Sequence, residues 1–372
     1  MASKHLMNFV QGKSIDEIID ILKRSPYHVS VKVKEDLALF KYSDVGNLDD
    51  PLVQECRGMI LQIHPNNVYT VAAKPFPKFF NYHEKQAAII DWSTAVIEEK
   101  IDGSFLKYYY HNGLWRWASM GCIDAKDAQI NETSSLQDLI EDVLKENPVY
   151  RKVLETCKPG YTYLFELVHP ENRIVVIYEK SDLYYLSAFE NSSGLELHRR
   201  ESLPCFGHPK TYSMFSLEEC IEKAKTLPAS EEGYVVVDDQ GHRVKIKGND
   251  YIRQHVNQGQ NKKLTGVDLF EAFIHGKLDD DPMYYKDKIV MSDMFDAFEN
   301  QINTLYAKYV HITDRKELWN TMKRDSLTKM NQSWISDAWS SKQTHIVVVE
   351  KLKTLPLKRA FDNFQEMKFS HG

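Results

Sequence analysis

The stretch EEKIDGSFLKYYY, residues 98–110, places a lysine at the end of one predicted strand and directly before another. Lys100 is followed by Asp102 and Gly103, which favour turns, and then by a run of apolar and aromatic residues typical of a β-strand. A lysine beside an Asp-Gly turn is usually a solvated turn residue. Lys100 therefore becomes a candidate for chemistry only in combination with other residues.

Short β-like runs continue outward from this stretch over residues 53–252, and turn-forming sequences such as HNG and DDQG separate them. The runs are ECRGMILQI (55–63), NVYTVAAK (67–74), FLKYYYHNGLWRWASM (105–120), YTYLFELV (161–168), RIVVIYE (173–179), LYYLSAF (183–189) and EGYVVVDDQGHRVKIK (232–247). Helical spacing interrupts them at 134–148 and 216–227. This pattern predicts a mixed core of antiparallel strands with flanking helices.

The pattern changes after residue 251, where apolar residues recur every three or four positions. Examples are Phe295, Phe298, Ile302, Leu305 and Tyr309. The sequence thus predicts an α+β core over residues 1–252 and an all-α domain over residues 253–372.

Composition and charge exclude several classes of protein. The 372 residues carry a net charge of −6, and residues 253–372 hold 18 Lys and Arg against 16 Asp and Glu, so no uniformly basic nucleic-acid coat is present. Five cysteines without a CxxC pair argue against a disulfide framework and a cysteine zinc site. No apolar run is long enough to span a membrane, and the N-terminus resembles neither a secretory signal nor a transit peptide. We therefore expect a cytoplasmic protein.

Four charged residues lie inside runs that otherwise look buried. They are Glu166, Glu232, Lys245 and Lys247. In a strand, Lys245 and Lys247 share one face, opposite Val244 and Ile246. Two like charges on one face are explained by an anion that bridges them or by a solvent-facing edge strand, where lysines discourage aggregation. The residues alone leave both explanations open.

Taken in order, KIDGS (100–104), LFELV (164–168), EGYVVV (232–237) and VKIK (244–247) resemble motifs of the covalent nucleotidyltransferases, which include DNA ligases, RNA ligases and messenger-RNA capping enzymes. Within that superfamily, ECRGMIL (55–61), AKPFPKFFN (73–81) and FELVHPENRIVVIY (165–178) resemble the phage-type RNA ligase 1 family. The resemblance covers roughly residues 35–255. It implies a nucleotidyltransferase core of ATP-grasp-like antiparallel sheets with flanking helices.

The resemblance also implies an ATP-dependent RNA ligase that joins a 5′-phosphate to a 3′-hydroxyl and uses magnesium. Lys100 would attack the α-phosphorus of ATP to form a lysyl-adenylate, and AMP would pass to the RNA 5′-phosphate before sealing. A lysine with an ordinary pKa of about 10.4 is mostly protonated at neutral pH. We therefore expect cations at Lys245, Lys247 and Arg57 to favour the neutral amine of Lys100.

The resemblance extends to further site residues. It implies contacts with ATP at Tyr42, Arg57, Lys74, Phe76, Lys100, Glu166, Glu232, Lys245 and Lys247, and more weakly at Tyr251. Glu166 and Glu232 would orient magnesium through its water shell and accept hydrogen bonds from the ribose, although either glutamate could instead simply pair with a lysine. The acidic run 279–281 predicts a helix cap or, less readily, a metal site at Asp280 and Asp281.

The chain departs from the family pattern at Met120, where the family often has a basic residue. A methionine cannot bind phosphate electrostatically, so either a nearby cation substitutes or this step is organised differently.

The partner implied is RNA, with repair of a broken tRNA anticodon loop as the suggested role. Lys351, Lys353, Lys358 and Arg359 form a candidate docking surface, although such a cluster can equally be a solvated face. We expect a monomer that acts in the cytoplasm, including a host cytoplasm if the protein is viral.

Two other classes of function compete with this hypothesis. A DNA ligase or a capping guanylyltransferase would share the Lys-x-Asp-Gly nucleophile, but in those families a β-barrel of the OB type follows the last motif, whereas a helical pattern follows here. A non-catalytic RNA-binding protein on the same fold would lack the nucleophile or the lysines at 245 and 247, and this chain has all three.

Overall fold

The protein was analysed as a computed structural model, which describes residues 4–43, 46–197, 203–257, 267, 270, 273–274, 285–343 and 345–369. The chain forms two compact units. The first comprises Met1–Ile19, Val29–Tyr42 and Leu48–Asn261, and the second comprises Asp20–His28, Ser43–Asn47 and Lys262–Gly372. The boundary predicted after residue 252 did not anticipate that two short N-terminal segments group with the C-terminal residues.

The first unit begins with helices and an antiparallel sheet of order β1-β2-β3-β4. The strands are β1 (Val29–Lys34), β2 (Leu37–Tyr42), β3 (Arg57–His64) and β4 (Val68–Ala73), and the helices are α1 (Lys4–Val10), α2 (Ile15–Leu22) and α3 (Pro51–Glu55). Asp50 caps α3 by accepting a hydrogen bond from the amide of Leu52. The pairing of β2 with β3 brings Lys41 opposite Arg57, which belongs to the predicted motif ECRGMIL (55–61).

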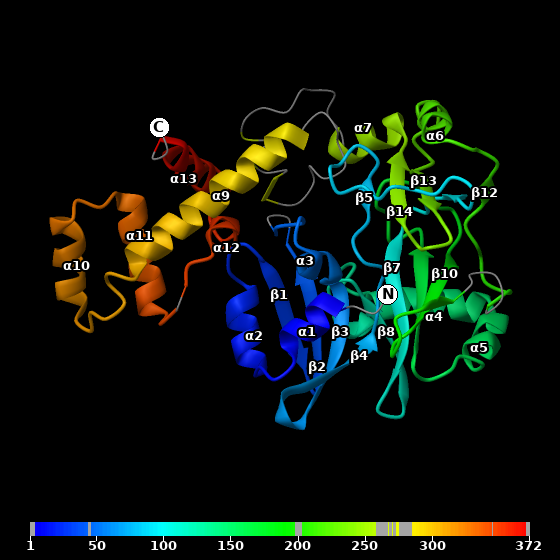
Figure 1. Ribbon diagram of the computed structural model, residues 1–372, viewed down its shortest axis with the longest axis horizontal. Helices are drawn as coiled ribbons and strands as arrows, with labels where there is room; N and C mark the ends of the chain where they lie inside the picture. Colours follow the sequence, from blue (N-terminus) through cyan, green and yellow to red (C-terminus); the bar gives the residue numbers. More distant parts are fainter. Residues whose placement is uncertain are drawn as a thin grey trace. The chain divides into compact units, whose positions relative to one another are not determined.

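The second sheet has the order β11-β10-β9-β7-β8, and its paired strands are antiparallel. Its strands are β7 (Ser104–His111), β8 (Leu114–Ser119), β9 (Tyr161–Val168), β10 (Asp182–Glu190) and β11 (Glu196–Leu197). Helices α4 (Leu136–Glu146) and α5 (Pro148–Leu154) pack on the face that carries Leu106, Phe165 and Leu167 (Figure 1). Because side chains alternate along a strand, the other face carries Phe105, Lys107 and Glu166.

The third sheet has the order β12-β6-β13-β14-β5. Its strands are β5 (Phe80–Asn81), β6 (Val96–Glu99), β12 (Thr211–Tyr212), β13 (Gly233–Val237) and β14 (Arg243–Lys247). Only β5 and β14 run parallel. Helix α6 (Leu217–Ala224) packs against this sheet, and α7 (Asn249–Asn257) follows β14. Val244 and Ile246 are buried while Lys245 and Lys247 lie on the opposite face, which confirms the predicted alternation.

The antiparallel sheets with flanking helices agree with the predicted class of core, but one predicted strand is wrong. Residues 173–179, RIVVIYE, form no strand. The amides of Val175 and Val176 donate to the carboxylate of Asp102 at 2.9 and 2.7 Å instead of pairing with a neighbouring strand. The apolar side chains at 175 and 176 are buried, which explains why their pattern resembles that of a strand.

The described part of the second unit is helical after residue 284. Its helices are α9 (Tyr285–Tyr306), α10 (Arg315–Arg324), α11 (Lys329–Ser340), α12 (Val348–Lys353) and α13 (Leu357–Phe369). Phe295, Phe298, Ile302 and Tyr309 are buried, as their spacing predicted. Nowhere in the described ranges does a helix combine the length and apolarity required to cross a membrane.

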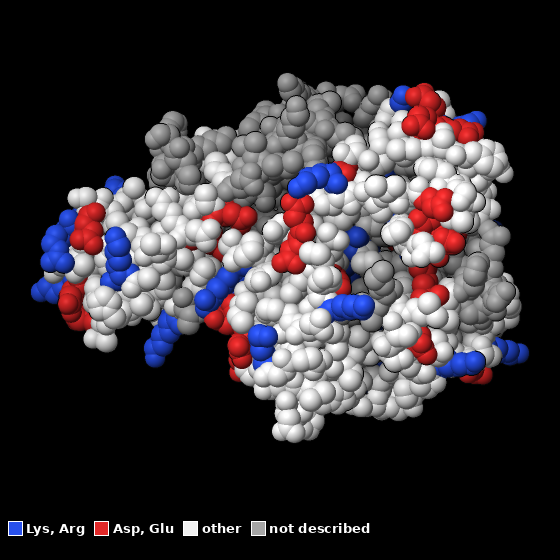
Figure 2. All heavy atoms as spheres, in the orientation of Figure 1, with Lys and Arg blue, Asp and Glu red and all other residues white. Residues whose placement is uncertain are grey.

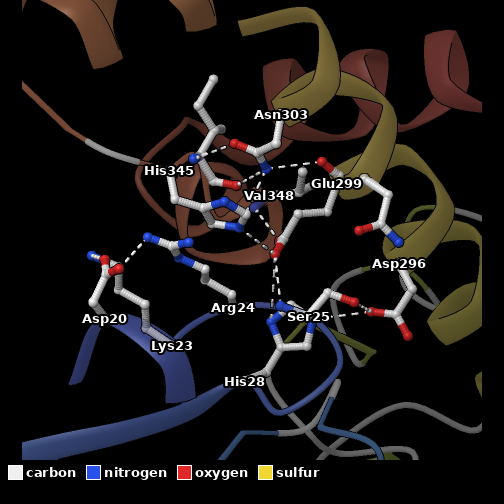
Figure 3. A network of polar contacts seen from close by, with 12 residues as sticks. Asp20, Lys23, Arg24, Ser25, His28, Asp296, Glu299, Asn303, His345 and Val348 are labelled. Atoms are coloured by element: carbon white, nitrogen blue, oxygen red, sulfur yellow. Dashed lines mark hydrogen bonds and ion pairs between the residues drawn. The ribbon is translucent and has the colours of Figure 1, made fainter. Parts of the chain in front are cut away.

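A buried carboxylate connects the segments of this second unit (Figure 3). Glu299, on α9, is 1% exposed and accepts hydrogen bonds from the amide of Ser25 at 3.2 Å and the amide of Val348 at 2.8 Å. The Nε2 atom of His345 lies 3.2 Å from the same carboxylate. Asp296, one turn earlier on α9, contacts the Nε2 atom of His28 at 3.0 Å. Segments far apart in the sequence therefore converge on one helix.

We expect Glu299→Gln to destabilise the second unit by about 2 kcal/mol, because an amide cannot accept with both of its polar atoms and leaves a buried donor unpaired. Urea unfolding of the full chain measures this loss. The control is Gln301→Ala, an exposed position on the same helix. Equal stability of the Glu299→Gln variant and the wild type would show that the network contributes little.

Candidate active site

Lys100 lies directly after β6 and is fixed there by its backbone. Its amide donates to the carbonyl of Gly233 at 2.8 Å, which places the side chain beside Glu232. The Nζ atom of Lys100 is 2.7 Å from one carboxylate oxygen of Glu232, and the Nζ atom of Lys247 is 2.9 Å from the other. Glu232 is only 4% exposed. The structure thus joins three predicted residues, Lys100, Glu232 and Lys247, in one ion-pair set centred on a buried carboxylate.

The sequence predicted cations around Lys100 and left open that a glutamate pairs with a lysine, and the structure pairs Lys100 with Glu232. Burial opposes ionisation of Glu232, but the ammonium groups of Lys100 and Lys247 outweigh it and lower the pKa of Glu232. Glu232 is therefore an ionised bridge between two lysines. In this arrangement the amine of Lys100 is bound as an ammonium, so it has to leave Glu232 and lose a proton before it can act as a nucleophile.

Glu166 is the second predicted carboxylate, and it lies on β9 near the same lysine. Burial raises the pKa of Glu166 to about 8, against the opposing influence of Lys100. Its carboxylate makes no hydrogen bond or ion pair with any described residue. A Cβ atom at Gly103 would lie 2.3 Å from the carbonyl of Leu167, so glycine is required for the turn after Lys100 to approach β9 this closely. This turn brings Lys100 toward Glu166.

Asp102 lies in the turn after Lys100 and fixes it through its side chain. Its carboxylate accepts from the amides of Val175 and Val176, and also from the hydroxyl of Tyr251 at 2.8 Å. The ring of Tyr251 is 1% exposed and lies 5.2 Å from the Nζ atom of Lys247. Asp102 therefore connects the turn after Lys100 to the segment after β9 and to α7.

Arg57 is a cation with a hydrogen-bond donor that no described residue binds. Its guanidinium lies between the rings of Phe79 and Phe105, at 5.5 and 5.1 Å. The Nη1 atom of Arg57 is buried and has no hydrogen-bond partner among the described residues. A buried donor left unpaired is costly, and native structures leave few of them. The simplest explanation is a bound anion, because phosphate and carboxylate oxygens match the guanidinium fork.

The structure places the remaining predicted nucleotide contacts less directly. Tyr42 neighbours the start of β3, because its amide donates to the carbonyl of Cys56 at 2.7 Å. Phe76 is buried in a cluster with the rings of Phe79, Phe105 and Phe189, two of which flank Arg57.

The amine of Lys74 is buried, donates to the carbonyl of Gly194 at 3.0 Å and lies 4.9 Å over the ring of Phe189. Lys245 shares the face of Lys247 on β14. Their proposed contacts with ATP stay predictions.

The predicted metal sites also stay predictions. Asp280 and Asp281 lie outside the described residues. Across the ranges that are described, no three His, Cys, Asp or Glu side chains gather closely enough to hold a metal ion. The chain's five cysteines are all free thiols.

Comparison with known proteins identifies the family. The family model for RNA ligase matches residues 55–251, which is just over half of the chain and includes every residue of the Lys100–Glu232–Lys247 set. The chain belongs to the RNA ligase family. The resemblance to phage-type RNA ligases drawn from the motifs is confirmed.

Two relatives illustrate the extent of the similarity. The RNA ligase of Rhodothermus phage RM378 is 25% identical over 82% of this chain and 83% of its own length. A protein of Autographa californica nuclear polyhedrosis virus named as a bifunctional polynucleotide kinase/RNA ligase is 31% identical over 67% of this chain. The chain spans only 38% of that viral protein's length. Among solved structures, an archaeal ATP-dependent RNA ligase is 11% identical over 91% of this chain and 98% of its own, with a TM-score of 0.46.

In this member of the RNA ligase family, the sequence motifs identified the charged site residues but not the residues that hold them in position, Asp102 and Lys107. The Asp of the KIDG sequence was interpreted as a turn former, whereas Asp102 is a buried acceptor of three hydrogen bonds. Lys107 received no role, although it is 0% exposed on β7. The only sequence signal for Lys107 was a lysine within an otherwise aromatic strand.

Proposed function

We propose that this chain is an ATP-dependent RNA ligase that joins a 5′-phosphate to a 3′-hydroxyl. The observation that carries the proposal is the Lys100–Glu232–Lys247 set together with the guanidinium of Arg57, whose Nη1 atom has no hydrogen-bond partner among the described residues. A nucleophilic amine, a second ammonium and a cation with an unused donor are what transfer of a nucleotidyl group requires.

The reaction would proceed in three transfers. The Nζ atom of Lys100 attacks the α-phosphorus of ATP, a P–N bond forms, and the bond to the β-phosphate breaks so that pyrophosphate leaves. The RNA 5′-phosphate then attacks the same phosphorus, which breaks the P–N bond and returns the amine to Lys100. Finally the RNA 3′-hydroxyl attacks the activated 5′-phosphate, and AMP leaves. In each transfer the surrounding cations stabilise negative charge on phosphate oxygens.

The chain's own residues would divide the work of the first transfer. Arg57 binds phosphate oxygens. These oxygens compete with Glu232 for the ammonium group of Lys100. Lys247 remains on Glu232 and holds that carboxylate in place while Lys100 leaves it. Asp102 keeps the turn rigid, so the amine of Lys100 needs to move only by side-chain rotation.

Magnesium is the metal that we propose for this site. Glu166 fits it because its carboxylate has no other partner among the described residues, and Glu232 would act through the metal's water shell. When bound, the ion neutralises phosphate charge. We do not place Asp280 and Asp281 in this role.

We expect formation of the lysyl-adenylate to speed up as the pH rises toward about 8, by about tenfold per unit below the midpoint. The raised pKa keeps Glu166 protonated below about pH 8, so the carboxylate that binds a cation forms only as the pH rises. Because metal binding favours the ionised form, more magnesium should move the midpoint to lower pH. Single-turnover rates at several magnesium concentrations measure this shift. A midpoint shift that persists in Glu166→Gln would exclude Glu166.

The helical second unit offers a surface for RNA on α10. Trp319 is 43% exposed, with the Nζ atom of Lys323 at 5.6 Å from its ring. Figure 2 shows lysine and arginine gathered over α10, with acidic residues among them. The exposed cations on and near this helix are Lys308, Arg315, Lys316, Lys323 and Arg324. An exposed tryptophan among cations suits single-stranded RNA, whose bases stack on aromatic rings and whose phosphates attract positive charge.

Trp319→Ala combined with Lys323→Ala should weaken binding of single-stranded RNA by about tenfold and leave the lysyl-adenylate step unchanged, because stacking of one base contributes about 1–3 kcal/mol. Fluorescence anisotropy with a labelled RNA oligonucleotide measures the affinity. The matched comparison is Lys351→Ala with Lys353→Ala, which tests the surface predicted on α12. Loss of affinity only in the α12 variant would place the RNA on α12.

The test of the proposed function is to offer the adenylylated protein single-stranded RNA, a nicked duplex and a broken stem-loop of tRNA type side by side. Sealed RNA is expected, and preference for the stem-loop would support tRNA repair. Sealing of DNA alone would favour a DNA ligase, and labelling from GTP in place of ATP would favour a capping enzyme. Absence of any covalent nucleotide would favour a non-catalytic RNA-binding protein. A cytoplasmic monomer stays part of the proposal.

A further inference from the structure

Lys107 is a buried amine that the proposed mechanism has not used. It lies on β7, seven residues after Lys100, and is 0% exposed. Its Nζ atom donates a hydrogen bond to the carbonyl of Gly58. Unlike Lys100 and Lys247, which share Glu232, Lys107 has no carboxylate within ion-pairing distance among the described residues. A buried ammonium without a counterion is costly, so this position requires an explanation.

The carbonyl that accepts from Lys107 belongs to the start of β3, next to Arg57, where the pairing with β2 shifts register and skips Gly58. Gly58 directly follows Arg57 and has a φ of +82°, which favours glycine. A Cβ atom there would lie 2.9 Å from the carbonyl oxygen of Met120, so the start of β3 is also packed tightly against the segment after β8. The hydrogen bond from Lys107 therefore fixes the backbone from which the unpaired guanidinium of Arg57 projects.

The charge state of Lys107 depends on what occupies the site. Burial, and secondly the positive charge of Arg57, lower the pKa of Lys107 to about 7, with Cys122 opposing them. A neutral amine still has N–H groups to donate, so the contact with Gly58 survives deprotonation. Negative charge brought to Arg57 would favour the protonated form of Lys107.

We propose that Lys107 is a positioning residue for the nucleotide phosphates, which fixes the backbone of β3 at Arg57 and Gly58 and takes up a proton from solvent when a polyphosphate binds at Arg57. The bound site then holds one more positive charge than the empty site. Gly58, to which Lys107 donates, packs against the backbone of Met120, the position where the family pattern led us to expect a basic side chain. The proposal rests on ATP binding at Arg57 but not on ligation.

Calorimetric titration of the full chain with a non-hydrolysable ATP analogue tests the proposal, because heats measured in buffers of different ionisation enthalpy report the protons taken up. At pH 7.5 we expect the wild type to take up more protons per analogue than Lys107→Met, by about half a proton or more, because a group with a pKa near 7 is mostly neutral there. The measurement is then repeated with Glu166→Gln added to both proteins. This substitution removes Glu166, the other nearby group that titrates in this pH range. Lys126→Met, an exposed lysine, is the control and should behave as the wild type does.

The affinity supplies a second readout. Lys107→Met should bind the analogue about tenfold more weakly, and its lysyl-adenylate step should show a raised KM for ATP with a smaller change in kcat, because the nucleophile is intact. Circular dichroism checks folding, and Lys107→Gln replaces Lys107→Met if the latter does not fold. Equal proton uptake by the wild type and the variant would overturn the role of Lys107 while leaving the proposed function standing. No uptake by the wild type would overturn it whether or not the variants fold. Failure of the wild type to bind the analogue would overturn both.

Discussion

Lys100→Ala should form no covalent AMP adduct, a loss of at least about four orders of magnitude in the first transfer, because no other amine in the described site can replace the nucleophile. Lys247, the other lysine on Glu232, is 6% exposed in its side chain and is fixed on β14. Incubation with ATP labelled at the α-phosphate and denaturing electrophoresis measure the adduct. Lys152→Ala, at an exposed lysine on α5, should label as the wild type does.

The same variant separates loss of the nucleophile from loss of the fold. Sealing of RNA that already carries a 5′-adenylate needs no lysyl-adenylate, so Lys100→Ala should retain this third transfer. Label on the alanine variant would contradict the assignment of Lys100. Loss of sealing on pre-adenylylated RNA would show instead that the substitution damages the site as a whole.

Glu232→Gln should reduce adduct formation by about a hundredfold to a thousandfold. The substitution removes the negative charge that Lys100 and Lys247 contact at 2.7 and 2.9 Å, and leaves two ammonium groups facing an amide. Because Glu232 is buried, breaking its ion pair with Lys247 costs about 3 kcal/mol of unfolding free energy.

The adduct assay and urea unfolding together measure both effects of Glu232→Gln. Glu232→Asp, which keeps the charge, should retain more of the stability than of the activity, because a shorter side chain cannot contact both amines at once. If Glu232→Gln forms the adduct at the wild-type rate, the assignment of Glu232 to the site is wrong. Unchanged stability would mean that the ion pairs of Glu232 contribute little to the fold.

Sequence analysis could predict those parts of the site that depend on local sequence patterns. Alternation along β14 placed Lys245 and Lys247 on one face, and charged residues in apolar runs marked Glu166 and Glu232. The segment 173–179 was predicted wrongly because it is a loop, bound to Asp102, that buries Val175 and Val176. A hydrogen bond between residues more than seventy positions apart leaves no trace in local periodicity.

The same limit applies to Lys107 and to the second unit. The role of Lys107 depends on the carbonyl of Gly58, which lies 49 positions away and on another sheet. The grouping of Asp20–His28 with the C-terminal helices depends on Glu299, whose partners lie at both ends of the chain. Helix spacing predicted α9 correctly, but no pattern indicated which distant segment its buried carboxylate would bind.

The most direct test of the central claim is mass spectrometry of peptides from the wild-type protein after incubation with ATP and magnesium. We predict the mass of one AMP, in an acid-labile phosphoramidate, on the peptide that contains Lys100. AMP on any other residue, or none on a folded protein that binds ATP, would contradict the account.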